Sequence, residues 1–160
     1  MIIQSLDLVN FRNIEKANLA FSATFNVIRG RNAQGKTIFL EAIHLFSLGR
    51  SFRNRRREEM IRFDEEFLFA RLACASDTGV SFRIDIGLER GGRISVSVNG
   101  KKLSSLSEII GIMPTVIFTP EDVALATGPP SERRTFIDYT ASQISPAFLQ
   151  NLKEYRKVLS

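Results

Sequence analysis

Residues 24–47 read TFNVIRGRNAQGKTIFLEAIHLFS, and this order of residues predicts a buried strand, a tight loop and a helix. The strand would span residues 25–28, and the helix would begin near Lys36 and end before Gly49. The helix has a broad apolar face made of Ile38, Leu40, Ala42, Ile43, Leu45 and Phe46. A strand, a glycine-containing loop and a helix in succession are typical of α/β proteins.

The loop fits the phosphate-loop pattern G-x-x-x-x-G-K-[ST] at every required position. Its residues are Gly30, Arg31, Asn32, Ala33, Gln34, Gly35, Lys36 and Thr37. Backbone N–H groups of such a loop converge on a phosphate, and the following helix directs its positive end to the same place. Lys36 would neutralise the β- and γ-phosphates, and the Thr37 hydroxyl would hold Mg²⁺. We therefore expect the chain to bind a nucleoside triphosphate.

Composition indicates a globular protein of one ordinary domain. The chain has 160 residues, of which 44% are hydrophobic and 24% charged, close to globular averages. Cys74 is the only cysteine, which excludes an internal disulfide. The first residues lack a signal-peptide pattern, and no apolar run approaches the length that crosses a membrane. We expect a cytoplasmic protein with no membrane partner.

Positive charge is concentrated just after the phosphate loop. Residues 29–62 contain nine basic and three acidic side chains, a local excess of six, whereas the whole chain carries +5. Five arginines stand close together: Arg50, Arg53, Arg55, Arg56 and Arg57. The guanidinium fork matches phosphate geometry, so this arginine cluster predicts contacts with DNA. Two alternatives remain open: a solvated face paired with nearby acids, or a brace for the nucleotide loop supplied by Arg50 or Arg53.

Strand and helix patterns flank this central unit. Apolar runs over residues 2–11 and 14–21 predict a hairpin, and period-two alternation over residues 67–75, 80–88 and 94–98 predicts an antiparallel meander. Residues 115–118 predict a second buried strand. Helices are expected over residues 131–144 and 146–160, on either side of Pro146. His44 lies about two helical turns from the loop and is expected to be structural.

Five segments, in this order, resemble the RecF-type DNA repair ATPases, which are relatives of the ABC-like heads of structural-maintenance (SMC) and Rad50-type proteins. The segments are LVNFRN at 8–13, GRNAQGKTIFLEAI at 30–43, GRSFR at 49–53, FTPED at 118–122 and GPPSERRTFID at 128–138. The phosphate loop alone is shared with many NTPases, but the ordered set is far more specific. The resemblance spans essentially the whole chain.

The resemblance implies an α/β P-loop NTPase fold: an ABC-ATPase-like head, lobe I, with a mixed sheet, an antiparallel meander and C-terminal helices. Residues 1–145 would form this lobe, and residues 146–160 would begin a truncated helical arm. ATP and Mg²⁺ are the implied ligands. Arg12 and Asn13 would approach the nucleotide from the hairpin tip, although an exposed turn is an equal alternative.

The resemblance also implies partners and a role. These are DNA with gaps or single-/double-strand junctions, a RecR-type recombination mediator, an ATP-dependent homodimer, and recombinase loading in repair and the SOS response. Family members place a signature loop and a Walker B acid pair further along, and these are not in the 160 residues. We therefore expect weak ATP binding and negligible hydrolysis from this chain alone.

Two other functions fit parts of the sequence. A small P-loop kinase would use residues 50–57 as a lid, but the antiparallel meander argues against it. A DNA-binding module with a vestigial nucleotide loop is the other alternative. Ala33 would be the sign of such a loop, because nucleotide-binding loops often have glycine at this position. The Cβ of alanine disfavours a positive φ, so it would disturb the loop if the residue needs that conformation.

Overall fold

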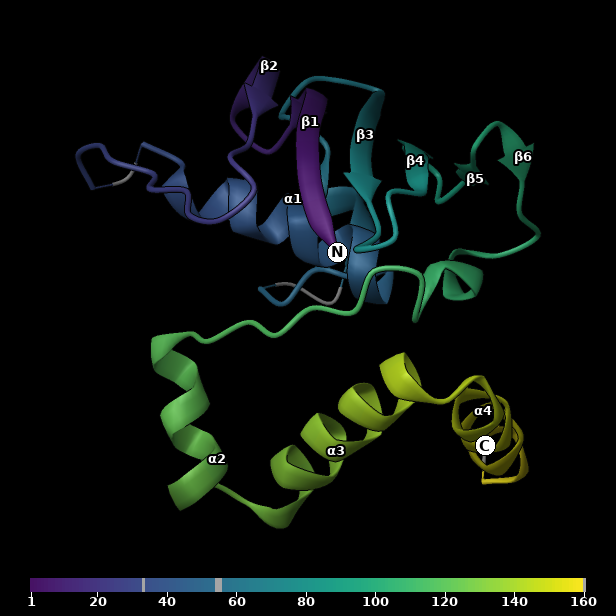
Figure 1. Cartoon of the computed structure of the whole chain (residues 1–160). Helices are drawn as coiled ribbons and strands as arrows, with labels where there is room; N and C mark the ends of the chain where they lie inside the picture. The colour runs from purple at the N-terminus through teal and green to yellow at the C-terminus, as the bar shows by residue number, and fades with distance from the viewer. Residues whose placement is uncertain (33, 54–55, 160) are drawn as a thin grey trace.

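The computed structural model describes residues 1–32, 34–53 and 56–159 (Figure 1). Its upper layer is a six-stranded sheet in the order β2-β1-β3-β4-β5-β6. The strands are β1 (Ile2–Phe11), β2 (Ile14–Ala20), β3 (Phe67–Ala75), β4 (Ser81–Glu89), β5 (Ile94–Val98) and β6 (Lys101–Lys102). Every pairing between them is antiparallel. The predicted hairpin and meander are confirmed.

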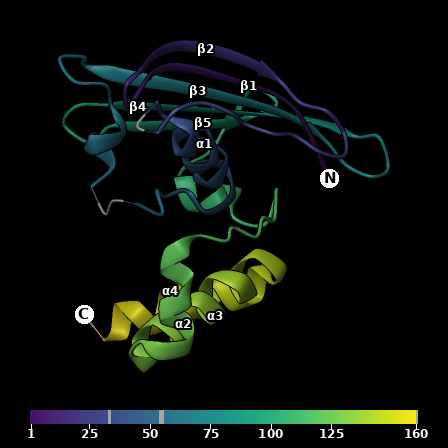
Figure 2. The same cartoon turned by 90° about the vertical axis from the view of Figure 1, so that its left-hand side faces the viewer.

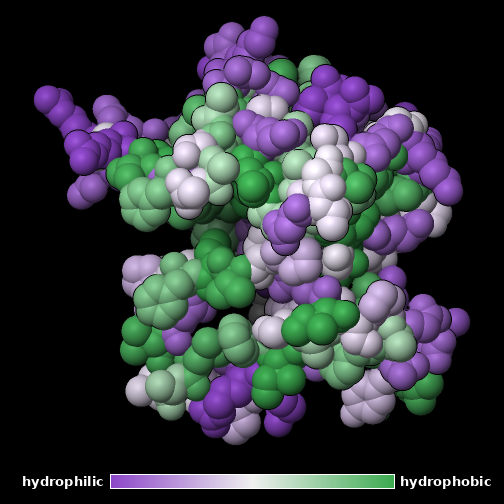
Figure 3. Space-filling model, viewed as in Figure 1, coloured by the Kyte–Doolittle hydropathy of each residue, from purple (hydrophilic) through white to green (hydrophobic). Residues whose placement is uncertain are grey.

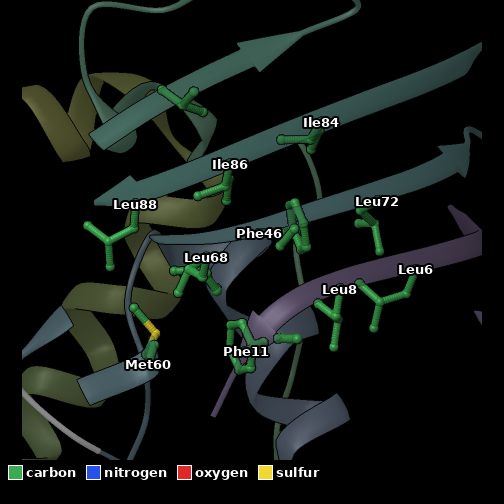
Figure 4. Packing of buried hydrophobic residues seen from close by; sticks show 14 of the residues in the cluster. Leu6, Leu8, Phe11, Phe46, Met60, Leu68, Leu72, Ile84, Ile86 and Leu88 are labelled. Carbon is green, nitrogen blue, oxygen red and sulfur yellow. The ribbon is translucent and has the colours of Figure 1, made fainter. Parts of the chain in front are cut away.

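Strand register sorts the side chains onto two faces. Leu6 pairs with Leu72, and Leu72 pairs with Ile84, so these three apolar side chains share the inner face, where all are buried. Figure 4 shows them beside further apolar side chains of β1, β3 and β4. The outer face instead carries the matched charges of Arg71 and Asp85, whose Nε and Oδ1 atoms are 2.6 Å apart. This alternation is the reason that the period-two pattern predicts the sheet well.

Helix α1 (Lys36–Leu48) covers the inner face of the sheet (Figure 2). Ile38, Ala42, Leu45 and Phe46 are buried there. The helix ends at Gly49, which adopts the left-handed conformation with φ 66°. A Cβ at this position would lie 2.8 Å from the Leu106 side chain, so only glycine fits both the turn and the packing. Two short 3₁₀ helices, η1 (Arg57–Met60) and η2 (Leu106–Ile109), also contribute buried side chains to this core.

A helical layer lies on the other side of α1 from the sheet (Figures 1 and 2). It contains η3 (Pro120–Val123), α2 (Ala124–Thr127), α3 (Pro130–Ile144) and α4 (Pro146–Val158). Gln143 joins the layers, because its Oε1 accepts hydrogen bonds from Ser47 Oγ and Thr115 N, both at 2.8 Å. No helix in the described part of the chain is long and apolar enough to cross a membrane.

Two predicted buried strands, at residues 25–28 and 115–118, are wrong. Both segments lack strand structure, and Phe25, Val116 and Phe118 are 77%, 92% and 85% exposed. An apolar run of this kind forms a buried strand only between neighbouring strands. Among the described residues, no strand lies beside either segment, so the sheet is antiparallel rather than mixed. On the face shown in Figure 3, apolar surface gathers around the notch between the two layers.

The same change, phenylalanine to alanine, at one buried and one exposed position tests this distinction between the core and the exposed segments. Phe46 is fully buried, so Phe46→Ala should lower the free energy of unfolding by about 3–5 kcal/mol. Phe118→Ala is the matched control and should change it by less than about 0.5 kcal/mol, because the ring is already in solvent. Urea unfolding followed by circular dichroism measures both. Equal losses would show that Phe118 is packed in solution.

Candidate nucleotide site

The phosphate loop folds back on the amino end of α1. Lys36 Nζ donates hydrogen bonds to Gly30 O and Arg31 O, both at 2.7 Å. Arg31 N donates to Gln34 Oε1 at 3.0 Å, which closes the loop on itself. Ala33 lies outside the described residues, so its effect on the loop stays a prediction. The described part of the loop therefore brings one ammonium group to the start of the helix.

Gly35 is the residue on which the loop geometry depends. It caps α1 with φ 88°, a left-handed conformation that side-chain-bearing residues rarely adopt. A Cβ here would lie 3.1 Å from Asn13 Oδ1 and 3.3 Å from Ile38 Cδ1. Among the described residues, no side chain caps the helix. Ile38 N–H donates to Gly35 O at 2.9 Å, and the positive end of the helix dipole faces outward at Lys36 and Thr37.

A hollow of about 510 Å³ lies in front of these groups. Its lining comes from the hairpin tip, the loop, α1 and the turn after it: Asn13, Asn32, Gly35, Lys36, Thr37, Ile38 and Arg53. The volume is in the range of small-ligand sites. Among the described lining residues, the polar groups are cationic, amide or hydroxyl groups and none is a carboxylate. This arrangement is complementary in charge and hydrogen-bonding groups to an anion.

The donor set also fits the metal predicted from the sequence. Thr37 offers one hydroxyl at the hollow, and Mg²⁺ in nucleotide sites takes its other ligands from phosphate oxygens and water. Among the described residues, no three His, Cys, Asp or Glu side chains cluster as a metal site of their own. A magnesium ion here would therefore depend on the nucleotide.

The two hairpin-tip residues face different ways. Asn13 lines the hollow, but Arg12 turns toward α1. Its Nη2 and Nε donate to the two carboxylate oxygens of Glu41 at 2.6 and 3.2 Å, and its Nη1 donates to Glu59 O at 2.5 Å. Contact between Arg12 and nucleotide stays a prediction.

The arginine cluster divides into distinct places. Arg53 lines the hollow, whereas Arg50 donates to the Tyr139 hydroxyl of α3 and lies 4.5 Å above that ring. Arg56 and Arg57 are exposed. Arg55 lies outside the described residues. Among its described members, the cluster therefore combines one residue that lines the hollow, one bond between layers and two exposed cationic side chains.

Glu41 and Ser51 were missed by the sequence predictions. Glu41 is fully buried, and Ser51 Oγ donates to its carboxylate. A signal was present, because Glu41 stands three residues after Ile38 and four before Leu45, on the buried stripe of the helix. An acid at this spacing indicates a buried ionic contact rather than a solvated one.

His44 is structural, as predicted. It is buried on α1, its Nδ1 donates to Arg50 O at 2.9 Å, and its ring makes an edge-to-face contact with Phe52 at 5.4 Å. Burial lowers the pKa of His44 below its ordinary value of 6.5. The imidazole therefore holds the turn at residues 50–52 in its neutral form.

Comparisons with known proteins identify the family of the chain. The family described as the RecF/RecN/SMC N terminal domain matches residues 2–131. The DNA replication and repair protein RecF of Caldanaerobacter subterraneus subsp. tengcongensis is 41% identical over 160 residues, which are 100% of this chain and 44% of the relative. The chain thus spans less than half the length of the curated relatives it matches.

Solved structures of RecF and SMC proteins are also similar to the chain. A structure of the recombination mediator protein RecF with ATP, from the RecFOR pathway, superimposes with a TM-score of 0.93 at 40% identity. The match covers 98% of this chain and 42% of that one. A structure from work on ATP-driven dimerisation of SMC ATPases matches with a TM-score of 0.71 at 22% identity, over 87% of this chain and 99% of that one. This second likeness supports the fold alone.

A pH titration tests the role of His44. The unfolded chain takes up a proton at this residue below pH about 6.5, whereas the folded chain does so only at lower pH. The free energy of unfolding should therefore fall as pH drops below about 6.5, relative to a His44→Gln variant, which stays neutral. His44 is the only histidine, so its NMR titration is unambiguous. A native pKa at or above that of the urea-unfolded chain would contradict the assignment.

Proposed function

The chain belongs to the RecF/RecN/SMC N-terminal domain family, and from this membership we propose that it is the ATP-binding and DNA-contacting part of a RecF-like replication and repair protein. One observation carries the proposal: phosphate-binding groups from the hairpin tip, the loop, α1 and Arg53 line one hollow. The ATP-bound RecF structure, at 40% identity, supports ATP as the nucleotide.

Each group at the hollow has a role in this proposal. Backbone N–H groups at the start of α1 would bind phosphate oxygens, and the Thr37 hydroxyl would hold Mg²⁺. Lys36 leaves the carbonyls of Gly30 and Arg31, to which it is bonded, and binds the terminal phosphates instead. Asn13 and Arg53 contact the nucleotide from the sides of the hollow.

Hydrolysis needs a group that activates water, and no carboxylate is among the described residues of the hollow. We therefore assign the chain ATP binding with negligible turnover of its own. In the whole protein, ATP would hold two subunits together on DNA at gaps or junctions. A RecR-type mediator, recombinase loading, the SOS response and a cytoplasmic location belong to the same proposal.

The kinase alternative is not favoured. Its fold would continue with further βα units, whereas the chain turns into an antiparallel sheet and its similar proteins are RecF and SMC proteins. The binding test that follows distinguishes the vestigial-loop alternative, which expects no saturable binding of nucleotide.

Isothermal titration of the 160-residue chain with ATP and Mg²⁺ tests nucleotide binding. We expect saturable binding that weakens without Mg²⁺, and Lys36→Ala should remove at least about 90% of the affinity, because it deletes the cation nearest the phosphates. Arg93→Ala is the control, since Arg93 is an exposed arginine of the sheet region that pairs with Glu89. Absence of saturable binding to the parent chain would favour the vestigial loop.

Salt dependence tests the DNA surface. Each arginine that contacts phosphate contributes roughly one unit to the slope of log affinity against log salt. Replacing the exposed Arg56 and Arg57 by alanine should therefore reduce the slope for a gapped duplex by about two units. Arg93→Ala, again as the control, should leave it unchanged. An unaltered slope in the double variant would place the DNA surface elsewhere.

A further inference from the structure

We propose that Glu41 is a positioning residue of the nucleotide site, which sets the places of Asn13 and Arg53 without touching the ligand. The proposal rests on the proposed function, because it concerns how the same hollow is assembled. It assigns a role to a buried acid that the phosphate-loop pattern does not contain.

Glu41 joins two loops that are distant in the sequence. Its carboxylate is fully buried on α1, where an unpaired charge would be costly. It accepts two hydrogen bonds from Arg12 of the hairpin tip and one from Ser51 of the turn after the helix. One carboxylate thereby fixes two segments that both reach the hollow.

The path from Glu41 to Arg53 has two hydrogen bonds. Ser51 Oγ donates to the carboxylate and accepts the backbone N–H of Arg53 at 2.9 Å. Ser51 is only 4% exposed, so water does not readily replace this link. Because Arg53 lines the hollow, its backbone is held from inside the protein while its side chain faces the ligand site.

The path from Glu41 to Asn13 runs through the strained hairpin tip. Arg12 has φ 56°, a left-handed conformation that is uncommon for arginine. Its N–H donates to Met60 O at 2.7 Å, and its guanidinium contacts Glu41 and Glu59 O, so the conformation is held at several points. The next residue, Asn13, follows this held backbone, and its side-chain oxygen lies beside Gly35.

Stability alone does not account for this arrangement. A buried ion pair is commonly no more stable than apolar residues of the same volume, which this stripe of α1 could have used. The contacts of Glu41 instead have an effect that an apolar side chain lacks: they determine the relative positions of two polar loops. A carboxylate does this because both of its oxygens accept directional hydrogen bonds, whereas an amide has only one such oxygen and a methyl group has none.

The experiment is a mutant cycle on ATP affinity, measured by titration with Mg²⁺ present. Glu41→Gln should weaken binding about tenfold, the usual size of effects from groups that orient ligand-binding residues. In a background with Asn13→Ala and Arg53→Ala, the same change should alter the Kd by less than about twofold, because the residues that Glu41 positions are gone. A structural defect would act equally in both backgrounds.

Controls separate this proposal from simpler explanations. Asp85→Asn removes another partly buried ion pair, on the outer face of the sheet, and should leave the ATP affinity unchanged. If Glu41→Gln does not fold, Ser51→Ala takes its place. Its loss of affinity should then disappear in an Arg53→Ala background.

Three results would overturn the positioning role. They are unchanged affinity in folded Glu41→Gln, equal losses in both backgrounds, and an equal loss in Asp85→Asn. Failure of the proposed function looks different, since the parent chain would then bind no ATP or would bind it without need of Lys36. Parent binding that depends on Lys36 but not on Glu41 rejects the positioning role alone.

Discussion

Packing of α1 against the inner face of the sheet is the constraint on which the remaining structure depends. Ile38, Ala42, Leu45 and Phe46 are buried in that contact, which fixes both the axis and the rotation of the helix. The rotation then decides where each other side chain points. It directs the open amino end to the hollow, Glu41 to the hairpin tip and Ser47 to the helical layer. One apolar interface thus orients three polar contacts, because a helix buried along one face cannot turn.

Much of this arrangement could be predicted from the sequence. The hairpin and meander have alternating patterns, and the limits of α1 follow from Lys36 and Gly49. These features depend on the local spacing of apolar residues and on one buried face, and that spacing can be seen directly in the sequence. The phosphate-loop residues were found for the same reason, since their pattern is contiguous. Asn13 and Arg53 came from outside the pattern, and the structure brings both to the hollow.

Other features depend on which segments become neighbours, and local patterns do not contain that information. Residues 25–28 have a strand composition but no adjacent strand among the described residues. Arg12 was placed near the nucleotide by the family resemblance and Arg50 on the DNA surface by charge, yet in the structure Arg12 bonds Glu41 and Arg50 bonds Tyr139. The need of Glu41 for a partner could be predicted, because an acid on a buried stripe is costly when unpaired. The identity of its partners could not, because Arg12 and Ser51 lie 29 and 10 residues away in the sequence.

The exposed segments at residues 25–28 and 115–118 have a consequence for handling the chain at high concentration. Both segments carry exposed apolar side chains and lack strand pairing in the structure. Backbones in this state are templates for pairing between molecules, which is the first step of aggregation. The edge of the sheet at β6 is better protected, since this strand consists of two lysines. We therefore expect pairing between molecules to begin at these unpaired segments rather than at β6.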